Sequence, residues 1–378
     1  MSRLAELAWL FLRLGTTAFG GPAAHIAMMQ DEVVSRKRWL TREQFLDRLG
    51  AAGLIPGPTS TEMTIYIGYL RAGWAGLIVA GVCFIVPAAL LVGAIAWAYV
   101  RFGNLPQAAG ILRGVKPVVI AIVAQAIWNL GRSAVKTKFL GALGLASAAA
   151  SLASAPLVVL AGAGTVCGFA EWWKARRLAP ALALAAIAAA VVLGQFAPVA
   201  AASRGAPAAG ASALFLYFLK IGSVLYGSGY VLLAFLQRDL VARWHWLTSR
   251  QLLDAVAVGQ ITPGPVFTTA TFIGALLAGA PGAVAATAGI FVPAFFFCAI
   301  SGPLIPRLRR SPIAGAFLDG VNVASLALMA VVTWYLARSA LVSPFTILLA
   351  LASAVLLFRY RVSSAWLVLG GAILGAAT

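Results

Sequence analysis

Residues 53–68 read GLIPGPTSTEMTIYIG, and residues 259–274 read GQITPGPVFTTATFIG. Each stretch places two prolines around a glycine within a strongly apolar chain. Proline removes a backbone donor and clashes with the preceding helical turn, so each Pro-Gly-Pro predicts the end of one helix and the start of another. In hydrocarbon, such a break is tolerable only where the freed carbonyls and amides face protein or water.

The composition around these breaks is that of a membrane protein. Of the 378 residues, 62% are hydrophobic and 10% are charged, whereas soluble domains have about 45–50% and about 25%. Several apolar stretches are long enough to cross a bilayer as helices. The clearest are 75–100, 114–131, 178–203, 281–303 and 313–336. We therefore expect an all-α polytopic membrane protein, because a β-barrel would alternate polar and apolar residues.

The excess of positive charge predicts anionic partners. Twenty-eight Lys and Arg residues against ten Asp and Glu residues give a formal charge of +18. In a membrane protein this excess usually places basic loops against anionic cytoplasmic lipid. The alternative is that part of the charge attracts an anionic substrate. The cysteines Cys83, Cys167 and Cys298 lie in apolar segments without metal-like spacing, so we interpret them as small buried hydrophobic residues.

An internal repeat organises the chain. A shift of 207 residues aligns FLRLGTTAFGGP (11–22) with FLKIGSVLYGSG (218–229), and no gap is needed through the Pro-Gly-Pro motifs. We expect an N-terminal transporter repeat at 1–177, a linker helix at 178–211 and a C-terminal transporter repeat at 212–378. Repeats of this size are typical of secondary transporters, although a structural membrane protein can also arise by duplication.

The number of membrane crossings decides whether the halves are inverted. If 44–70 crosses once as a broken helix, the count is thirteen and the halves are opposed. If 44–70 dips in and returns, the count is eleven and the halves are parallel. The basic residues of 36–42 and 238–250 favour the parallel arrangement, because both loops would then be cytoplasmic. The residues leave both arrangements open, with 11–13 transmembrane segments.

The two breaks form the first candidate substrate site. A helix N-terminus carries unpaired amides and about half a positive charge, which suits an anion, and the hydroxyls after each break can contribute. The alternative is a kink that serves only packing. The candidate substrate-binding residues are Pro56, Gly57, Pro58, Thr59, Ser60, Thr61, Pro263, Gly264, Pro265, Thr268 and Thr269.

The first segment of each half is also interrupted by glycines. Gly20 and Gly21 in the first half, and Gly227, Ser228 and Gly229 in the second, are added to the substrate-binding candidates, with helix packing as the alternative. Arg13 and Lys220 occupy equivalent apolar segments. Intramembrane cations usually pair with substrate, carboxylate or backbone, so we expect both to bind substrate. Snorkelling to the interface is the alternative.

The acidic residues supply candidates for coupling. Glu62 lies one turn past the first break, where the second half has Thr269, and could carry a proton or pair with Arg13. Asp319, in an apolar segment, is a second coupling candidate. For Asp47 and Asp254 we favour a role at a helix N-terminus over proton transfer. His25 is interpreted as a packing or hydrogen-bonding residue.

No enzyme motif is present in the sequence. It has no phosphate-binding loop, no metal-spaced His and Cys set, and two histidines in all. We therefore expect no enzyme activity, cofactor, metal site or nucleic-acid partner, and energy from a gradient or the membrane potential.

The stretches FGGPAAHIAMMQDEVVSRKRWLT, GLIPGPTSTEMTIYIGYLRAG and GQITPGPVFTTATFIGALLAG resemble the chromate ion transporter family, across both halves. The resemblance implies a bacterial inner-membrane carrier, driven by a gradient, that expels chromate, with sulfate as the similar anion. It also implies oppositely oriented halves, so we expect inversion despite the loop charges. The second half departs from the first with YGSG for FGGP and ITPGP for LIPGP.

Three functions therefore compete. Chromate efflux ranks first, with protons as a candidate coupling ion and a homodimer as a candidate assembly. A sulfate or other oxyanion permease on the same scaffold ranks second. A membrane-embedded assembly subunit ranks third, because a scaffold gains nothing from costly polar groups in hydrocarbon.

Overall fold

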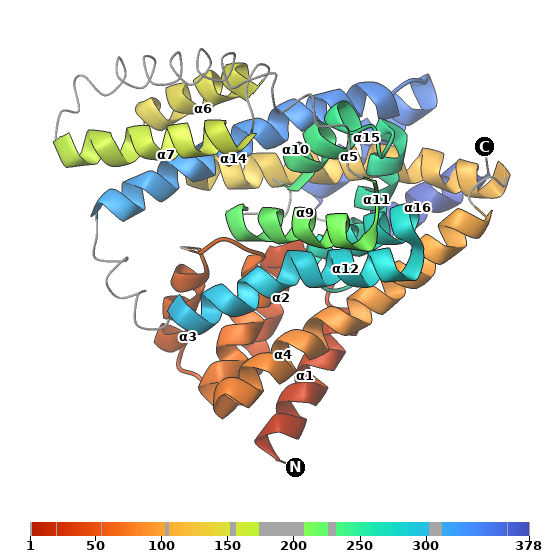
Figure 1. The fold of residues 1–378 in the computed structure, drawn as a ribbon. Coiled ribbons are helices and arrows are strands. Elements are labelled where there is room, and N and C mark those ends of the chain that lie inside the picture. Colours follow the sequence, from red (N-terminus) through yellow and green to blue (C-terminus); the bar gives the residue numbers. More distant parts are fainter. Residues whose placement is uncertain are drawn as a thin grey trace.

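The computed structural model describes residues 2–19, 21–53, 55–102, 106–151, 156–173, 208–225, 232–301, 312–360 and 362–377. All regular elements in these ranges are helical, as expected (Figure 1). The expected linker helix, Gly20, Gly227, Ser228 and Gly229 fall outside the described residues, apart from 208–211 at the end of the linker.

The same series of elements occurs twice. The first half contains α1 (Arg3–Thr17), α2 (Gly21–Gln30), the π-helical η1 (Asp31–Arg36), α3 (Arg42–Ala52), α4 (Thr59–Phe102), α5 (Pro106–Ala134), α6 (Lys138–Ser151) and α7 (Pro156–Trp173). The second half contains α9 (Ala211–Val224), α10 (Leu232–Leu236), the π-helical η4 (Gln237–Arg243), α11 (Ser249–Ile261), the 3-10 turn η5 (Val266–Thr268), α12 (Thr269–Ser301), α14 (Pro312–Ala340), α15 (Pro344–Arg359) and α16 (Ser364–Ala376). Even the π-helical stretches correspond, so the sequence repeat is a structural repeat.

Trp-Leu-Thr occurs at 39–41 and again at 246–248, and each copy leads into one of two matched helices. Thr41 caps α3 and Thr248 caps α11, and each accepts a hydrogen bond from the backbone amide three residues on. The glutamine at that third position, Gln44 or Gln251, accepts a bond from the threonine amide in return. Such reciprocal caps satisfy two backbone donors that the first helical turn would leave open.

Both Pro-Gly-Pro motifs break helices as predicted. In the first half, α3 ends at Ala52 and α4 begins at Thr59, and in the second, α11 ends at Ile261 and η5 begins at Val266. A second interruption of the helical backbone follows each break. Gly73 and Gly279 have φ of 60° and 61° inside α4 and α12, and each divides its long helix into two arms.

Four described helices are long and apolar enough to cross a membrane. They are Thr59–Phe102, Gly110–Arg132, Val266–Ser301 and Gly315–Ala340. These coincide with four of the five clearest apolar stretches, and the fifth, 178–203, is not described. Shorter apolar helices surround them. The chain is a multi-pass membrane protein, and the count of 11–13 segments stays a prediction.

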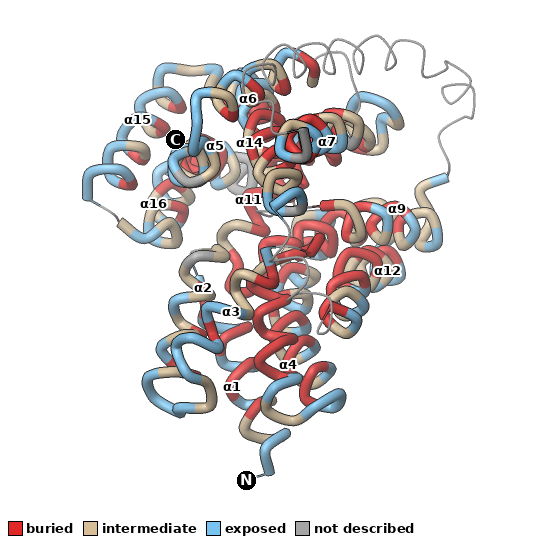
Figure 2. The backbone as a smooth tube through the Cα atoms, turned by 90° about the vertical axis from the view of Figure 1, so that its left-hand side faces the viewer, coloured by how far each residue is buried: buried red, intermediate tan, exposed pale blue. Residues whose placement is uncertain are grey.

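The two halves are interlocked. Helix α5 of the first half packs on α15 and α16, while α14 of the second half packs on α6 and α7 (Figure 1). Small residues permit these contacts: a Cβ on Gly114 would meet the backbone of Gly371, and a Cβ on Gly320 would meet the backbone of Ala163. Close backbone approach of this kind is how membrane helices associate. Buried residues gather where α4, α11 and α12 meet and again among α5, α7 and α14 (Figure 2).

Candidate functional site

The Pro-Gly-Pro breaks contact the opposite halves. The amide of Gly57 donates to the carbonyl of Leu225 at 2.8 Å, and the amide of Gly264 donates to the carbonyl of Ala18 at 3.0 Å. Ala18 and Leu225 are the C-caps of α1 and α9. Each break therefore closes the carbonyl end of the other half's first helix, and the two contacts are related by a 207-residue shift. This reciprocity is the signature of a two-fold relation between the halves.

These bonds change what the breaks can offer an anion. The central amide of each motif is already engaged, so Gly57 and Gly264 can bind substrate through that amide only if the halves separate. Pro56, Gly57, Pro58, Pro263, Gly264 and Pro265 are all buried. The anion site at the breaks stays a prediction, and it now requires movement of one half against the other.

Glu62 points back at the first break. Its side chain is fully buried, and neither carboxylate oxygen has a hydrogen-bond partner. A Cβ built on Gly57 would collide with Glu62 Oε1. The pairing of Glu62 with Arg13 that the sequence left open is wrong, because Arg13 binds Glu32 instead. An isolated ionised carboxylate in such a place is costly, so its neutral form is favoured.

Polar groups continue along the interface from Glu62. One turn further on, Tyr66 shares a 2.6 Å hydrogen bond with Ser301 of α12, and both side chains are buried. The Arg48 guanidinium lies 6.0 Å from the centre of the Tyr66 ring. Cys298 Sγ lies 3.9 Å from the backbone carbonyl of Glu62. The two halves thus share a narrow polar strip that begins at Glu62.

The hydroxyls after the breaks are less available than predicted. Thr268 donates to the carbonyl of Pro265 and Thr269 to that of Val266, both at 2.9 Å. These bonds close the first turn of the helix, so neither hydroxyl donates to a ligand in this conformation. In the first half, Thr61 Oγ1 is buried and has no partner, and Ser60 is also buried.

His25 makes a structural contact at the second break, as predicted. Its Nε2 lies 3.0 Å from the carbonyl of Ala18, the same oxygen that accepts the Gly264 amide. A carbonyl only accepts, so Nε2 carries the proton. The ring also packs edge-on against Phe84. The two breaks are therefore chemically different: one holds a carboxyl group and the other an imidazole.

Arg13 and Lys220 each lie near an acidic residue of their own half. Arg13 forms an ion pair with Glu32 at 2.5 Å, and Lys220 interacts electrostatically with Asp239, the residue equivalent to Glu32. Arg13 lines a cavity of about 380 Å³ in which two arginines face Asp31 and Glu32. The structure thus favours the carboxylate partner over a substrate ligand for Arg13.

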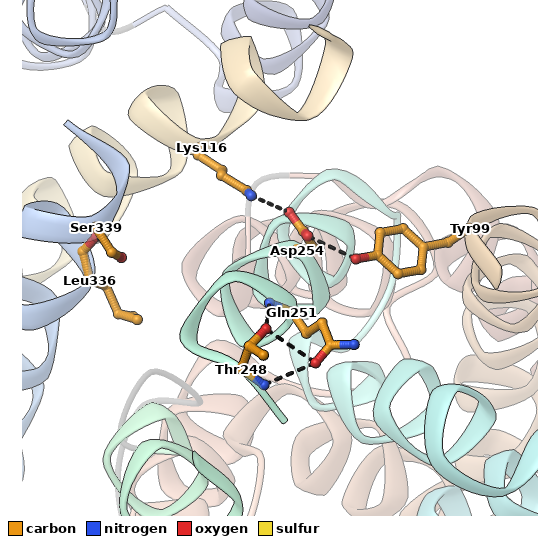
Figure 3. Close-up of polar contacts among 7 residues, drawn as sticks. All are labelled: Tyr99, Lys116, Thr248, Gln251, Asp254, Leu336 and Ser339. Carbon is orange, nitrogen blue, oxygen red and sulfur yellow. Dashed lines mark hydrogen bonds and ion pairs between the residues drawn. The ribbon is translucent and has the colours of Figure 1, made fainter. Parts of the chain in front are cut away.

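Asp254 does not have the predicted role at a helix N-terminus. It is the sixth residue of α11 and fully buried, and Asp47 is likewise the sixth residue of α3. Asp254 forms an ion pair with Lys116 at 2.9 Å and accepts a hydrogen bond from Tyr99 at 2.9 Å (Figure 3). Lys116 and Tyr99 were not predicted, although the lysine inside the apolar stretch 114–131 is a recognisable signal.

Asp319 also has a partner. Lys136 Nζ lies 2.7 Å from Asp319 Oδ1, and both side chains are partly exposed. Its role in coupling stays a prediction. The described residues contain no cluster of His, Cys, Asp and Glu that could hold a metal ion.

Comparison with known proteins identifies the family of both halves. A family model described as chromate transporter matches residues 5–206, which cover the first half and most of the expected linker, and residues 212–376 of the second half. The chain belongs to the chromate transporter family. A chromate transport protein of Cupriavidus metallidurans is 35% identical over 98% of this chain and 92% of its own length. A probable chromate transport protein of Synechococcus elongatus is 32% identical over 89% of this chain and 86% of its own length.

A third member of the chromate transporter family, a chromate transport protein of Pseudomonas aeruginosa, is 31% identical over 87% of this chain and 80% of its own length. No solved structure shows significant similarity to the chain.

Proposed function

We propose that this chain carries chromate out of the cytoplasm across a bacterial inner membrane. Family membership over both halves supports the substrate, and the apolar helices support the membrane location. The single observation that carries the mechanism is the partnerless carboxyl group of Glu62, buried against the break where the two halves meet.

Glu62 and an oxyanion at the first break exclude one another when both are charged. The Glu62 carboxyl group occupies the space in front of Gly57, and two negative charges a few ångströms apart repel strongly in a low dielectric. A dianion can therefore approach this break only when Glu62 is protonated or has moved away. Proton binding at Glu62 then permits anion binding, and flux rises as pH falls.

The membrane potential supplies the driving force. Moving one charge across 100 mV is worth about 2.3 kcal/mol, so a dianion leaving a negative interior gains about twice that. A chromate ion can therefore move outward without ATP, even when one proton accompanies it and cancels half of the charge.

A sulfate or other oxyanion permease is the alternative within the same scaffold, because chromate and sulfate are both tetrahedral dianions. The assembly-subunit alternative leaves the buried Glu62 unexplained, since an unpaired polar group in hydrocarbon destabilises a scaffold. A homodimer stays a prediction.

The experiment is flux measurement in everted membrane vesicles. Chromate and sulfate uptake into these vesicles reports export from the cytoplasm, and it is measured with an imposed potential, with an imposed pH gradient, and with neither. We expect chromate uptake to increase with an interior-positive potential. Equal chromate movement in vesicles with and without the protein would contradict the proposal.

A further inference from the structure

A cationic cavity lies away from the breaks, where the halves meet around α5. It has a volume of about 390 Å³ and is bounded by α5, α11, the end of α14 and the start of α15. Arg113, Lys116 and Arg250 line it, together with the polar residues Ser339, Ser343 and Thr346. The cavity is larger than a small tetrahedral anion requires.

The charges around this cavity do not balance. Lys116 forms an ion pair with Asp254. Among the residues that the structure describes, no carboxylate lies within ion-pair distance of Arg113 or Arg250. Both arginines are exposed, and together they carry two positive charges without a described carboxylate partner, which matches the charge of one dianion. Guanidinium groups bind oxyanions through parallel N–H donors, the strongest such contacts in proteins.

The other half does not reproduce this excess. Asp319 lies 206 positions after Arg113, at the equivalent place in α14, and it pairs with Lys136. A cation in one half is therefore replaced by an acid in the other. A packing role would be expected in both halves, whereas a binding site for an anion is needed at one.

Asp254 connects the cavity to the second break. It lies on α11, the helix that ends at Ile261, two residues before Pro263. Lys116 comes from the first half and Asp254 from the second, so their ion pair spans the halves (Figure 3). An anion held by Arg113 and Arg250 competes with Asp254 for Lys116 and thereby weakens that link.

We propose that this cavity is a binding site for a free tetrahedral dianion, which is collected there before it reaches the breaks. The proposal rests on the proposed function for its substrate class and adds the site, its residues and its link to α11. An anionic lipid headgroup offers similar phosphate chemistry, and the experiment separates the two sources.

The experiment measures sulfate and chromate binding by titration calorimetry on the full chain in nanodiscs of zwitterionic lipid. Replacing both arginines (Arg113→Gln with Arg250→Gln) should weaken sulfate binding by about thirtyfold or more, since each lost charge-assisted contact costs about 1.5–3 kcal/mol. The control is Arg132→Gln, which removes a charge about 28 Å further along α5. It should leave binding within about twofold of wild type.

Asp254→Asn gives a result that a structural role would not produce. The amide keeps the Tyr99 contact but frees Lys116, so sulfate should bind about threefold or more tightly. Weaker binding in Asp254→Asn, or unchanged binding in the double arginine variant, would overturn the proposal. Loss of wild-type sulfate binding in discs of phosphatidylglycerol would assign the cavity to lipid and overturn it too.

The same preparations are assayed for chromate flux. Flux without sulfate or chromate binding at the cavity contradicts this site and leaves the proposed function standing. Binding that depends on the arginines, in a protein that moves no chromate, contradicts the proposed function and leaves the site standing.

Discussion

The amide of Gly57 and the carbonyl of Leu225, 168 positions apart in the sequence, are joined by a 2.8 Å hydrogen bond that crosses between the halves. Gly264 and Ala18 repeat the contact with the halves exchanged. Each break thus has two tasks: it ends one helix and caps the first helix of the other half. Any rocking of the halves must strain or exchange both bonds. We therefore call these two contacts, Gly57 with Leu225 and Gly264 with Ala18, the joint between the halves.

Alanine at Gly264 should destabilise this joint. Gly264 has φ of 87°, and a Cβ there would lie 2.7 Å from the Cβ of Ala88. The backbone strain alone costs about 1–3 kcal/mol. We expect Gly264→Ala to lower the thermal unfolding temperature of the detergent-solubilised protein and to reduce chromate flux.

A second substitution separates steric crowding from backbone strain at Gly264. Ala88→Gly removes the nearest atom, so the double variant should recover part, but not all, of the lost stability. At Gly57 the nearest atom belongs to Glu62, so Ala294→Gly should not rescue Gly57→Ala. Rescue there, or none at Gly264, would contradict the geometry of the joint.

Alanine at Gly73 measures the cost of backbone strain without a steric clash. Gly73 has φ of 60° and ψ of −147°, and nothing lies within 4 Å of an added Cβ. This conformation is almost restricted to glycine, so Gly73→Ala should cost about 1–3 kcal/mol without any clash. Gly93→Ala, also in open space but inside the helix, is the matched control and should not lower the unfolding temperature.

The repeat explains how much of this fold could be predicted. Proline chemistry predicts the helix ends at Ala52 and Ile261, and the aligned motifs predict paired elements. The partners of those elements could not be predicted. Nothing local to Gly57 indicates that its amide reaches Leu225, because a repeat is equally compatible with halves that fold separately and with halves that interlock.

The candidate site shows the same limit. Glu62 has no charged counterpart in the second half, where Thr269 stands instead, and this difference predicts a special role. The burial of Glu62 agrees with that prediction. The equivalence of Arg13 and Lys220 extends to their surroundings, because each lies near an acid of its own half, and their role as substrate ligands stays a prediction. The sequence cannot pair Lys116 with its carboxylate, because Asp254 is 138 positions away and its position predicts a helix-end role instead.

Neutralising Arg13 should have little effect on substrate affinity. Its guanidinium is partly exposed and binds Glu32, which keeps Arg36 as a second partner. Partly exposed pairs contribute about 0–1 kcal/mol. In Arg13→Gln we expect the half-saturation concentration for chromate to stay within about twofold of wild type. An increase above about tenfold, with no comparable change in Glu32→Gln, would restore Arg13 as a substrate ligand.

The orientation of the halves can be read from single cysteines. Lys37 and Trp244 occupy equivalent places after η1 and η4. In a variant without the three native cysteines, Lys37→Cys and Trp244→Cys are treated with a membrane-impermeant thiol reagent on intact cells and on everted vesicles. Inverted halves should expose the two positions on opposite sides. Labelling of both from the same side would favour parallel halves.

Glu62 provides the most direct test of coupling. Glu62→Gln keeps the volume and hydrogen-bonding ability of the side chain but is permanently neutral. Because anion binding at the first break requires a neutral side chain, wild-type flux should fall as pH rises through the titration of Glu62, whereas the flux of Glu62→Gln should stay flat. The potential is clamped with potassium and valinomycin, so that pH alone varies.

Thr269→Glu in the Glu62→Gln background completes this test by placing a carboxyl group at the second break. Thr269 is buried, and its hydroxyl lies where a Cβ on Gly259 would collide with it. A titrating carboxyl group there should restore a pH dependence, because Thr269 occupies the position in the second half that Glu62 occupies in the first. The matched control, Thr269→Gln in the same background, should leave the flux independent of pH. If Glu62→Gln alone keeps the wild-type pH profile, the coupling proton binds elsewhere and Asp319 becomes the next residue to replace.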